Sequence, residues 1–98
     1  MAAEVVWLDQ ARDDLCELLD FLHPSNPTAA LRYVDELEHA CEGLADFPMQ
    51  GWQYDERYRA VVVRNHLIFY RFEHSQNKIV VVAVIDGRRD LTRILGDR

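Results

Sequence analysis

The sequence predicts an α+β domain in which a helical hairpin packs on an antiparallel sheet. Two amphipathic segments with a short connector fill the first half of the chain, which is typical of two antiparallel helices. Three strand-like segments separated by short polar turns follow, which is typical of an antiparallel meander. The chain has 98 residues, of which 49% are hydrophobic, so residues 1–98 are expected to form a single domain.

A short strand and a helix are predicted first. The apolar run from Glu4 to Leu8 predicts the strand, and Asp9 is expected to cap the helix that follows. Leucines at three- and four-residue intervals give this helix one apolar face, at Leu15, Leu18, Leu19 and Leu22. The helix is predicted to end at His23-Pro24-Ser25, because a proline disfavours the α conformation of the residue before it.

The second helix is predicted to begin at Asn26-Pro27. Asparagine is a good N-cap, and proline at the first helical position loses no hydrogen bond. One apolar stripe runs along this helix, at Ala30, Val34, Leu37, Cys41 and Leu44. The order of the elements is therefore strand, helix and helix, before the loop at residues 47–51 leads into the meander.

The meander is predicted in the second half of the chain. Its strands run from Tyr58 to Arg64, from Leu67 to Glu73 and from Lys78 to Ile85, with turns at Asn65-His66 and at residues 74–77. The last strand is apolar on both faces, which indicates a central strand that is covered on two sides. Asp90 is expected to cap a short terminal helix that ends near Leu95.

The net charge of −6 is unevenly divided along the chain. Residues 1–50 carry two basic and eleven acidic residues, a net charge of −9, whereas residues 51–98 carry nine basic and six acidic residues, a net charge of +3. This division suggests two faces with different partners, or a solvated acidic helical surface with none. The acidic balance argues against nonspecific or direct sequence-specific binding of nucleic acid.

Neither a secretory signal nor an apolar run of about 20 residues occurs, so a cytoplasmic protein without a membrane partner is expected. The histidines lack metal-ligand spacing, and the glycines do not form a phosphate-binding loop. Cys16 and Cys41 fall within helical patterns and are expected to be small buried thiols. We therefore predict no catalytic residue, no metal and no cofactor.

Arginines are the remaining candidates for a functional site. The residues predicted to contact a target are Arg57, Arg59, Arg64, Arg88 and Arg89, since guanidinium groups match phosphate, carboxylate and carbonyl acceptors. The alternative is ordinary surface pairing with nearby carboxylates, those of Asp55, Glu56, Asp86 and Asp90. Trp52 and Tyr54 lie in a polar loop, where they anchor a partner or, as we favour, form a lid on the helix–sheet core.

Several motifs, taken with the order of elements, resemble the ParE toxins of the RelE/ParE superfamily over nearly the whole chain. The motifs are Asn26-Pro27-x-Ala29-Ala30-x-Arg32-Tyr33, Leu44-x-x-Phe47-Pro48-x-x-Gly51 and Val82-Ala83-Val84-Ile85-x-x-Arg88-x-Asp90-Leu91. The resemblance implies the toxin of a type II toxin–antitoxin system, which is often associated with plasmid stabilization. It also implies a ParD-like antitoxin in a toxin–antitoxin hetero-oligomer, and DNA gyrase as the target.

The RelE-like relatives cut messenger RNA on the ribosome with basic residues and a terminal tyrosine or histidine. Arg59 and Arg89 match two of the positions in that pattern, whereas Leu67 and Leu95 stand at two others, and Lys78 is the only lysine. We therefore expect a toxin that inhibits gyrase by binding it and is not an enzyme. The alternatives are a RelE-type endoribonuclease and a degenerate, nontoxic homologue that binds antitoxin. The antitoxin is expected on the outer helical faces and on a sheet edge.

Overall fold

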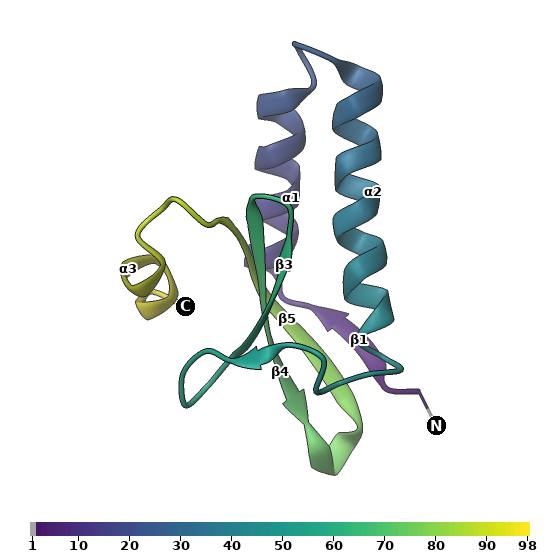
Figure 1. Ribbon diagram of the computed structural model, residues 1–98, viewed down its shortest axis with the longest axis vertical. Coiled ribbons are helices and arrows are strands. Elements are labelled where there is room, and N and C mark those ends of the chain that lie inside the picture. The colour runs from purple at the N-terminus through teal and green to yellow at the C-terminus, as the bar shows by residue number, and fades with distance from the viewer. Residues whose placement is uncertain (1) are drawn as a thin grey trace.

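The computed structural model describes residues 2–98 (Figure 1). Its elements are β1 (Glu4–Trp7), α1 (Asp9–Leu22), α2 (Pro27–Gly43), β2 (Trp52–Gln53), β3 (Arg59–Val63), β4 (His66–Glu73), a 3-10 turn (His74–Gln76), β5 (Lys78–Asp86) and α3 (Leu91–Gly96). The predicted α+β class, the helical hairpin on a sheet and the short C-terminal helix are confirmed.

The two helices of the hairpin begin in different ways. Asn26 caps α2 as predicted, because its Oδ1 accepts a hydrogen bond from the Ala29 N–H at 3.1 Å and Pro27 is the first helical residue. The predicted cap of α1 is wrong, since Leu8 holds the N-cap position without a side-chain hydrogen bond. Asp9 is instead the first helical residue, where its carboxylate lies near the positive end of the helix dipole.

The five strands form one sheet in the order β1-β5-β4-β3-β2. The predicted meander is confirmed, because β3, β4 and β5 pair antiparallel. The sheet as a whole is mixed and not purely antiparallel, because β1 pairs parallel with β5, from Glu4 opposite Lys78 to Trp7 opposite Val81. The long intervening chain between β1 and β5 leaves their direction free, whereas a tight hairpin turn requires antiparallel strands.

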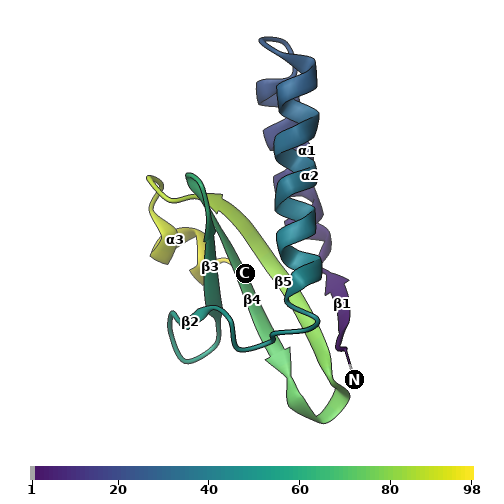
Figure 2. The same cartoon turned by 45° about the vertical axis from the view of Figure 1, so that its right-hand side comes forward.

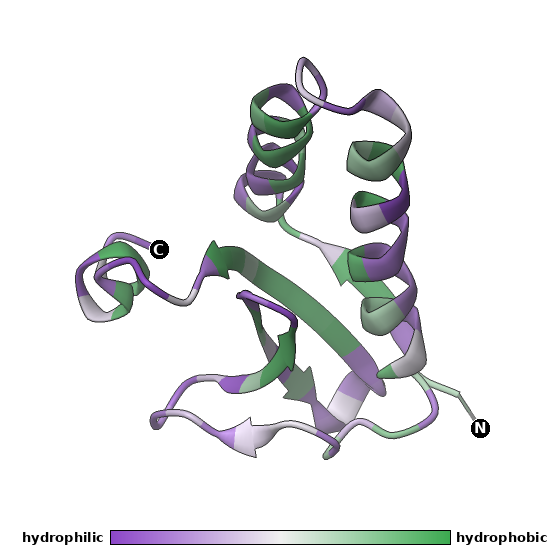
Figure 3. Ribbon diagram, turned by 45° about the horizontal axis from the view of Figure 1, so that its top comes forward, coloured by the Kyte–Doolittle hydropathy of each residue, from purple (hydrophilic) through white to green (hydrophobic). Residues whose placement is uncertain are grey.

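A β-bulge in β5 explains why this strand is buried on both faces. Tyr70 pairs with Val81 and Phe69 pairs with Ala83, so Val82 has no residue opposite it. The extra residue puts Val82 and Ala83 on the same face of the sheet and turns Val84 toward the helical hairpin. Figure 3 shows β5 as an almost unbroken apolar strand next to the hairpin.

A second small core covers the face of the sheet that is opposite the hairpin. Figures 1 and 2 place α3 and the hairpin on opposite sides of the sheet. Leu95 of α3 is buried in this core, and the Tyr54 ring meets Phe69 edge-on at 4.9 Å. The predicted lid is therefore formed by Tyr54 over this second core, while Trp52 stays 47% exposed.

Two further expectations need correction. The β3–β4 turn consists of Arg64 and Asn65, and His66 is the first residue of β4, so the predicted turn was one residue too late. Cys41 is buried as expected, which raises the pKa of its thiol to about 12, but Cys16 is exposed. Within residues 2–98, the helices are too short or too polar to cross a membrane.

Candidate functional site

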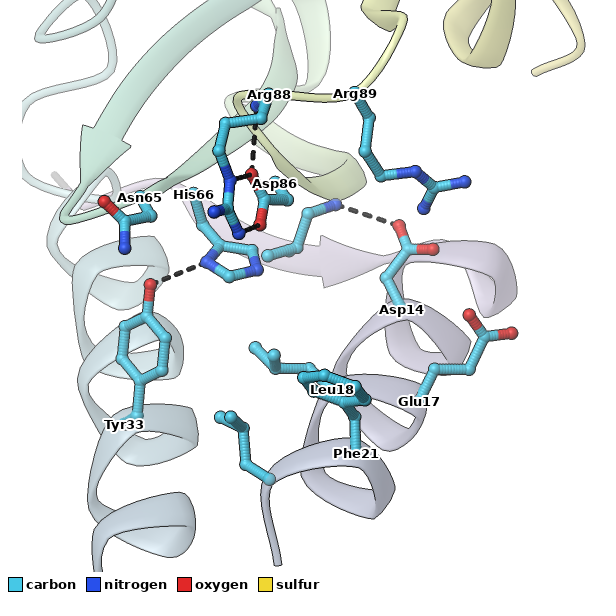
Figure 4. A pocket seen from close by; sticks show the side chains of 12 residues that line it. Asp14, Glu17, Leu18, Phe21, Tyr33, Asn65, His66, Asp86, Arg88 and Arg89 are labelled. Carbon is cyan, nitrogen blue, oxygen red and sulfur yellow. Dashed lines mark hydrogen bonds and ion pairs between the residues drawn. The ribbon is translucent and has the colours of Figure 1, made fainter. Parts of the chain in front are cut away.

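A groove lies between the helical hairpin and the end of the sheet where β4 begins and β5 ends (Figure 4). Its volume is about 490 Å³. We call it the hairpin groove; its lining residues are Asp14, Glu17, Leu18, Phe21, Leu22, Tyr33, Asn65, His66, Val84, Asp86, Arg88 and Arg89.

The apolar wall of the hairpin groove comes mainly from α1. Leu18, Phe21 and Leu22 follow each other at helical spacing and therefore share one face of that helix. The Phe21 side chain is 79% exposed although it is large and apolar. An exposed aromatic residue at the rim of an apolar groove is typical of a surface that binds another molecule.

The polar wall is built around His66, the one histidine of the chain that is buried. The Tyr33 hydroxyl on α2 lies 2.6 Å from His66 Nδ1 and 3.3 Å from the Val63 carbonyl oxygen, to which it donates. Burial lowers the pKa of His66, although the carboxylate of Asp86 acts in the opposite direction. Burial also raises the pKa of Tyr33. Both rings are therefore neutral near pH 7.

Two arginines lie at the mouth of the hairpin groove. The Arg88 guanidinium bonds both oxygens of Asp86, at 3.1 Å and 2.8 Å, and these hydrogen bonds hold the pKa of that carboxyl far below its usual range. The exposed Arg89 side chain has no ion pair or hydrogen bond among the described residues. Glu17 stands on α1 at the other side of the groove.

Asp14 and Arg98 close the edge of β5 beneath the groove, and we call this pair the edge clamp. Because β1 ends opposite Val81, the outer edge of β5 beyond that residue has no neighbouring strand. Asp14 Oδ2 accepts from the Val84 N–H at 2.9 Å, and Arg98 donates to the Val82 carbonyl oxygen at 3.1 Å. The two side chains also pair with each other and are only 14% and 13% exposed.

This combination of groups suits a polypeptide ligand. The apolar wall accepts aliphatic or aromatic side chains, while Arg89 and Glu17 offer one unshared charge of each sign. A phosphate-rich ligand would meet the carboxylates of Asp14, Glu17 and Asp86. Among residues 2–98, no group of three His, Cys, Asp or Glu side chains could hold a metal ion.

The structure does not bring the five predicted arginines together. Arg88 and Arg89 line the hairpin groove, and Arg64 lies beside a smaller hollow that adjoins it at Tyr33. Arg57 and Arg59 lie at the other end of β3. The predicted pairing with nearby carboxylates is present for Arg88 with Asp86 at 2.8 Å and for Arg57 with Asp55 at 3.7 Å, and Arg64 pairs with Glu36 at 3.0 Å.

The sequence analysis missed Tyr33, His66 and Asp14 as members of a site. His66 was assigned to a turn, so its place on β4 opposite Asp86 was not expected. Tyr33 belongs to the apolar stripe of α2 and meets His66 only through the packing of the hairpin on the sheet. The pairing of Asp14 with Arg98 spans 84 positions and has no local sequence signal.

Comparison with known proteins gives the family. The sequence matches the family described as "ParE toxin of type II toxin-antitoxin system, parDE" over residues 5–91. This chain belongs to the ParE toxin family. The match includes both helices of the hairpin, the whole sheet and every residue that lines the hairpin groove of this ParE protein. No curated protein sequence matched the chain.

Solved structures share the ParE fold described above. The chain is similar to one from the chromosomal ParDE toxin–antitoxin system of P. aeruginosa, with a TM-score of 0.75 and 16% identity, covering 87% of this chain and 96% of the other. It is also similar to one from the toxin–antitoxin complex RelBE2 of Mycobacterium tuberculosis, with a TM-score of 0.63 and 18% identity, covering 88% of this chain and 99% of the other. At these identities the likeness shows the fold alone.

Proposed function

We propose that this ParE-family chain is a toxin that inhibits DNA gyrase by binding it, and that a ParD-like antitoxin neutralises the toxin by occupying the hairpin groove. The observation that carries the proposal is the groove itself, which joins an apolar helical face to unshared charges of both signs. These features suit an amphipathic helix of a partner protein. Both similar solved structures come from toxin–antitoxin systems, which supports an antitoxin partner.

The geometry favours binding over RNA cleavage. Cleavage through a 2′-hydroxyl needs an acid–base group beside cations that face the phosphate. Arg59 begins β3 and Arg89 follows the end of β5, and these two strands run in the same direction, so the two arginines lie at opposite ends of the sheet. His66 can exchange a proton, but its neighbour Asp86 is an anion. We therefore propose that the chain acts without breaking a bond.

Two assays with the purified protein distinguish the possible targets. We expect inhibition in a gyrase supercoiling assay and no added cleavage of messenger RNA in a coupled translation reaction. Ribosome-dependent cleavage with unaffected supercoiling would contradict the proposal and favour the RelE-type activity. Antitoxin binding without either effect, and without growth arrest on expression, would indicate the degenerate homologue.

The antitoxin site is tested with the protein encoded by the reading frame that adjoins the gene. The Phe21→Asp substitution places a charge on the apolar wall and is expected to weaken antitoxin binding at least tenfold. Leu31→Asp is the matched control, because Leu31 is an exposed apolar residue of α2 outside the groove. Equal affinity of both variants for the antitoxin would exclude the hairpin groove as its site.

A further inference from the structure

Three large apolar side chains are exposed on the connector between α2 and β3. Phe47 is 69% exposed, Met49 is 53% exposed and Trp52 is 47% exposed. We call these residues the loop platform. It lies at the end of β3 opposite the hairpin groove, because β2 pairs with Arg59 and Ala60, whereas the groove lies beyond Val63.

The loop platform is held rigidly from beneath by two strands. The buried Tyr70 hydroxyl donates to the Pro48 carbonyl oxygen at 2.8 Å and accepts from the Gly51 N–H at 3.0 Å. The Arg59 guanidinium donates to the carbonyl oxygens of Met49, at 3.1 Å, and of Gly51. The loop backbone therefore has fixed partners on both β3 and β4.

Gly51 sets how close this connector lies to the sheet. A Cβ atom at this position would lie 2.5 Å from the Ala60 carbonyl oxygen and 2.9 Å from the Tyr70 hydroxyl. Only glycine fits there without a shift of the backbone, so the close approach of the loop depends on this residue.

Rigid display of apolar side chains points to a binding role. Exposed apolar area adds nothing to folding, and contiguous exposed patches mark interaction sites. A fixed loop also loses little conformational entropy when a partner binds, which favours affinity. Tryptophan and phenylalanine are among the side chains that contribute most to binding at protein interfaces.

The charge beside the loop platform indicates what the partner presents. A hollow of about 170 Å³ next to Met49 is lined by Arg57, Arg59 and Arg71 and by one carboxylate, that of Glu56. The carboxylates that now pair with Arg57 and Arg71 are those of Asp55 and Glu73, and these pairs are partly exposed. Exposed ion pairs are weak, so a partner carboxylate can replace either acid.

We propose that the loop platform is the surface through which this toxin binds its target protein, and that the target offers an apolar pocket with a carboxylate at its rim. This inference rests on the proposed function, in which the chain acts by binding a protein. It separates the target surface from the antitoxin groove, so that each can be altered without the other.

The test uses Phe47→Ser, Trp52→Ala and Met49→Lys in the full chain, with Leu31→Ala as the control for an exposed apolar residue elsewhere. Each platform variant is expected to raise the concentration needed for half-inhibition of gyrase at least tenfold and to reduce growth arrest. Affinity for the antitoxin is expected to change less than twofold, and the control is expected to match the wild type in every assay. Since these side chains are exposed, thermal midpoints identify any variant that fails to fold.

The outcomes separate this inference from the proposed function. Wild type that leaves gyrase unaffected overturns the proposed function, and the inference falls with it. Inhibition by the wild type and equally by all three platform variants overturns the inference alone. Equal loss of antitoxin affinity and gyrase inhibition in well-folded variants also overturns it, because the platform would then belong to the antitoxin site. So does self-association of the wild type that the variants abolish while gyrase inhibition stays unchanged.

Discussion

The two ends of β3 use arginine and apolar side chains in opposite ways. At the loop platform, Arg59 is turned inward onto loop carbonyls while Trp52 is exposed. At the hairpin groove, Arg88 and Arg89 are exposed while Leu22 lies in the wall. The difference teaches that the role of an arginine depends on which nearby acceptors lack partners. A connector without a neighbouring strand leaves carbonyl groups for Arg59, whereas the turn after β5 offers Arg88 only an exposed carboxylate.

The edge clamp gives the largest expected effect and tests whether the groove end is as firmly held as the platform. Asp14→Ala leaves Arg98 and the Val84 N–H without their partner, and both are mostly buried. We expect the free energy of unfolding to fall by about 3 kcal/mol, as when one member of a buried pair is removed. Urea denaturation measures the change. Asp13→Ala is the control, since Asp13 is an exposed neighbour on the same helix, with an expected change within about 0.5 kcal/mol. Equal losses for both variants would contradict a structural role of the clamp.

Two tyrosine hydroxyls compare the ends directly. Tyr70→Phe leaves the Pro48 carbonyl and the Gly51 N–H without a partner in a buried place, and is expected to cost about 2 kcal/mol of stability. Tyr33→Phe removes a contact with His66 where water has access, and is expected to cost about 1 kcal/mol. Denaturation of both variants under one condition gives the order. A greater loss for Tyr33→Phe would mean that the groove, and not the platform, is the more rigid end.

Local signals predicted the elements of this fold well. Asn26 and Asp90 cap their helices as expected, because a cap depends on residues within three positions of it. The position of the bulge at Val82 could not be predicted in this way. Since β5 is apolar on both faces, its sequence has no two-residue alternation that would reveal a change of face.

The candidate site was less predictable than the fold. Arg88 and Arg89 were expected to face a partner, and the turn after β5 does expose both. The role of Arg59 on the loop carbonyls depends on the path of a connector without sequence periodicity. A shift of one residue in the expected turn hid His66, because each such shift moves a strand residue to the other face.

His66 makes the stability of the groove end depend on pH. Burial lowers its pKa, so the folded chain holds the neutral ring while the unfolded chain binds a proton near pH 6.5. The unfolded state therefore gains protons first as the pH falls, and the free energy of unfolding is expected to decrease below about pH 6.5. Tyr33, Asp86 and Arg88 face the ring, and the carboxyl of Asp86 stays ionised over this range because Arg88 lowers its pKa.

The measurement for His66 is the stability at pH 5, 6 and 7. His66→Gln keeps an acceptor for the Tyr33 hydroxyl but removes the titrating group, so its stability is expected to depend less on pH in this range. The slopes are compared, and not the absolute values, because the substitution itself changes packing at a buried position. Identical slopes for the wild type and His66→Gln would show that the ring does not titrate differently on folding.

Arg64 gives the smallest expected effect and tests whether the groove end has guanidinium groups that a partner can use. Its guanidinium pairs with Glu36 at 3.0 Å, and the two side chains are 66% and 40% exposed. In a double-mutant cycle of Arg64→Ala and Glu36→Ala, we expect a coupling energy below about 0.5 kcal/mol, because solvent screens an exposed pair. The left-handed backbone of Arg64, with φ of 54°, is common to both alanine backgrounds and cancels in the cycle. A weak coupling leaves this side chain free to exchange Glu36 for a carboxylate of the antitoxin at little cost. A coupling above about 2 kcal/mol, a value expected of buried pairs, would make Arg64 a structural residue like Arg59 and remove the contrast between the two ends.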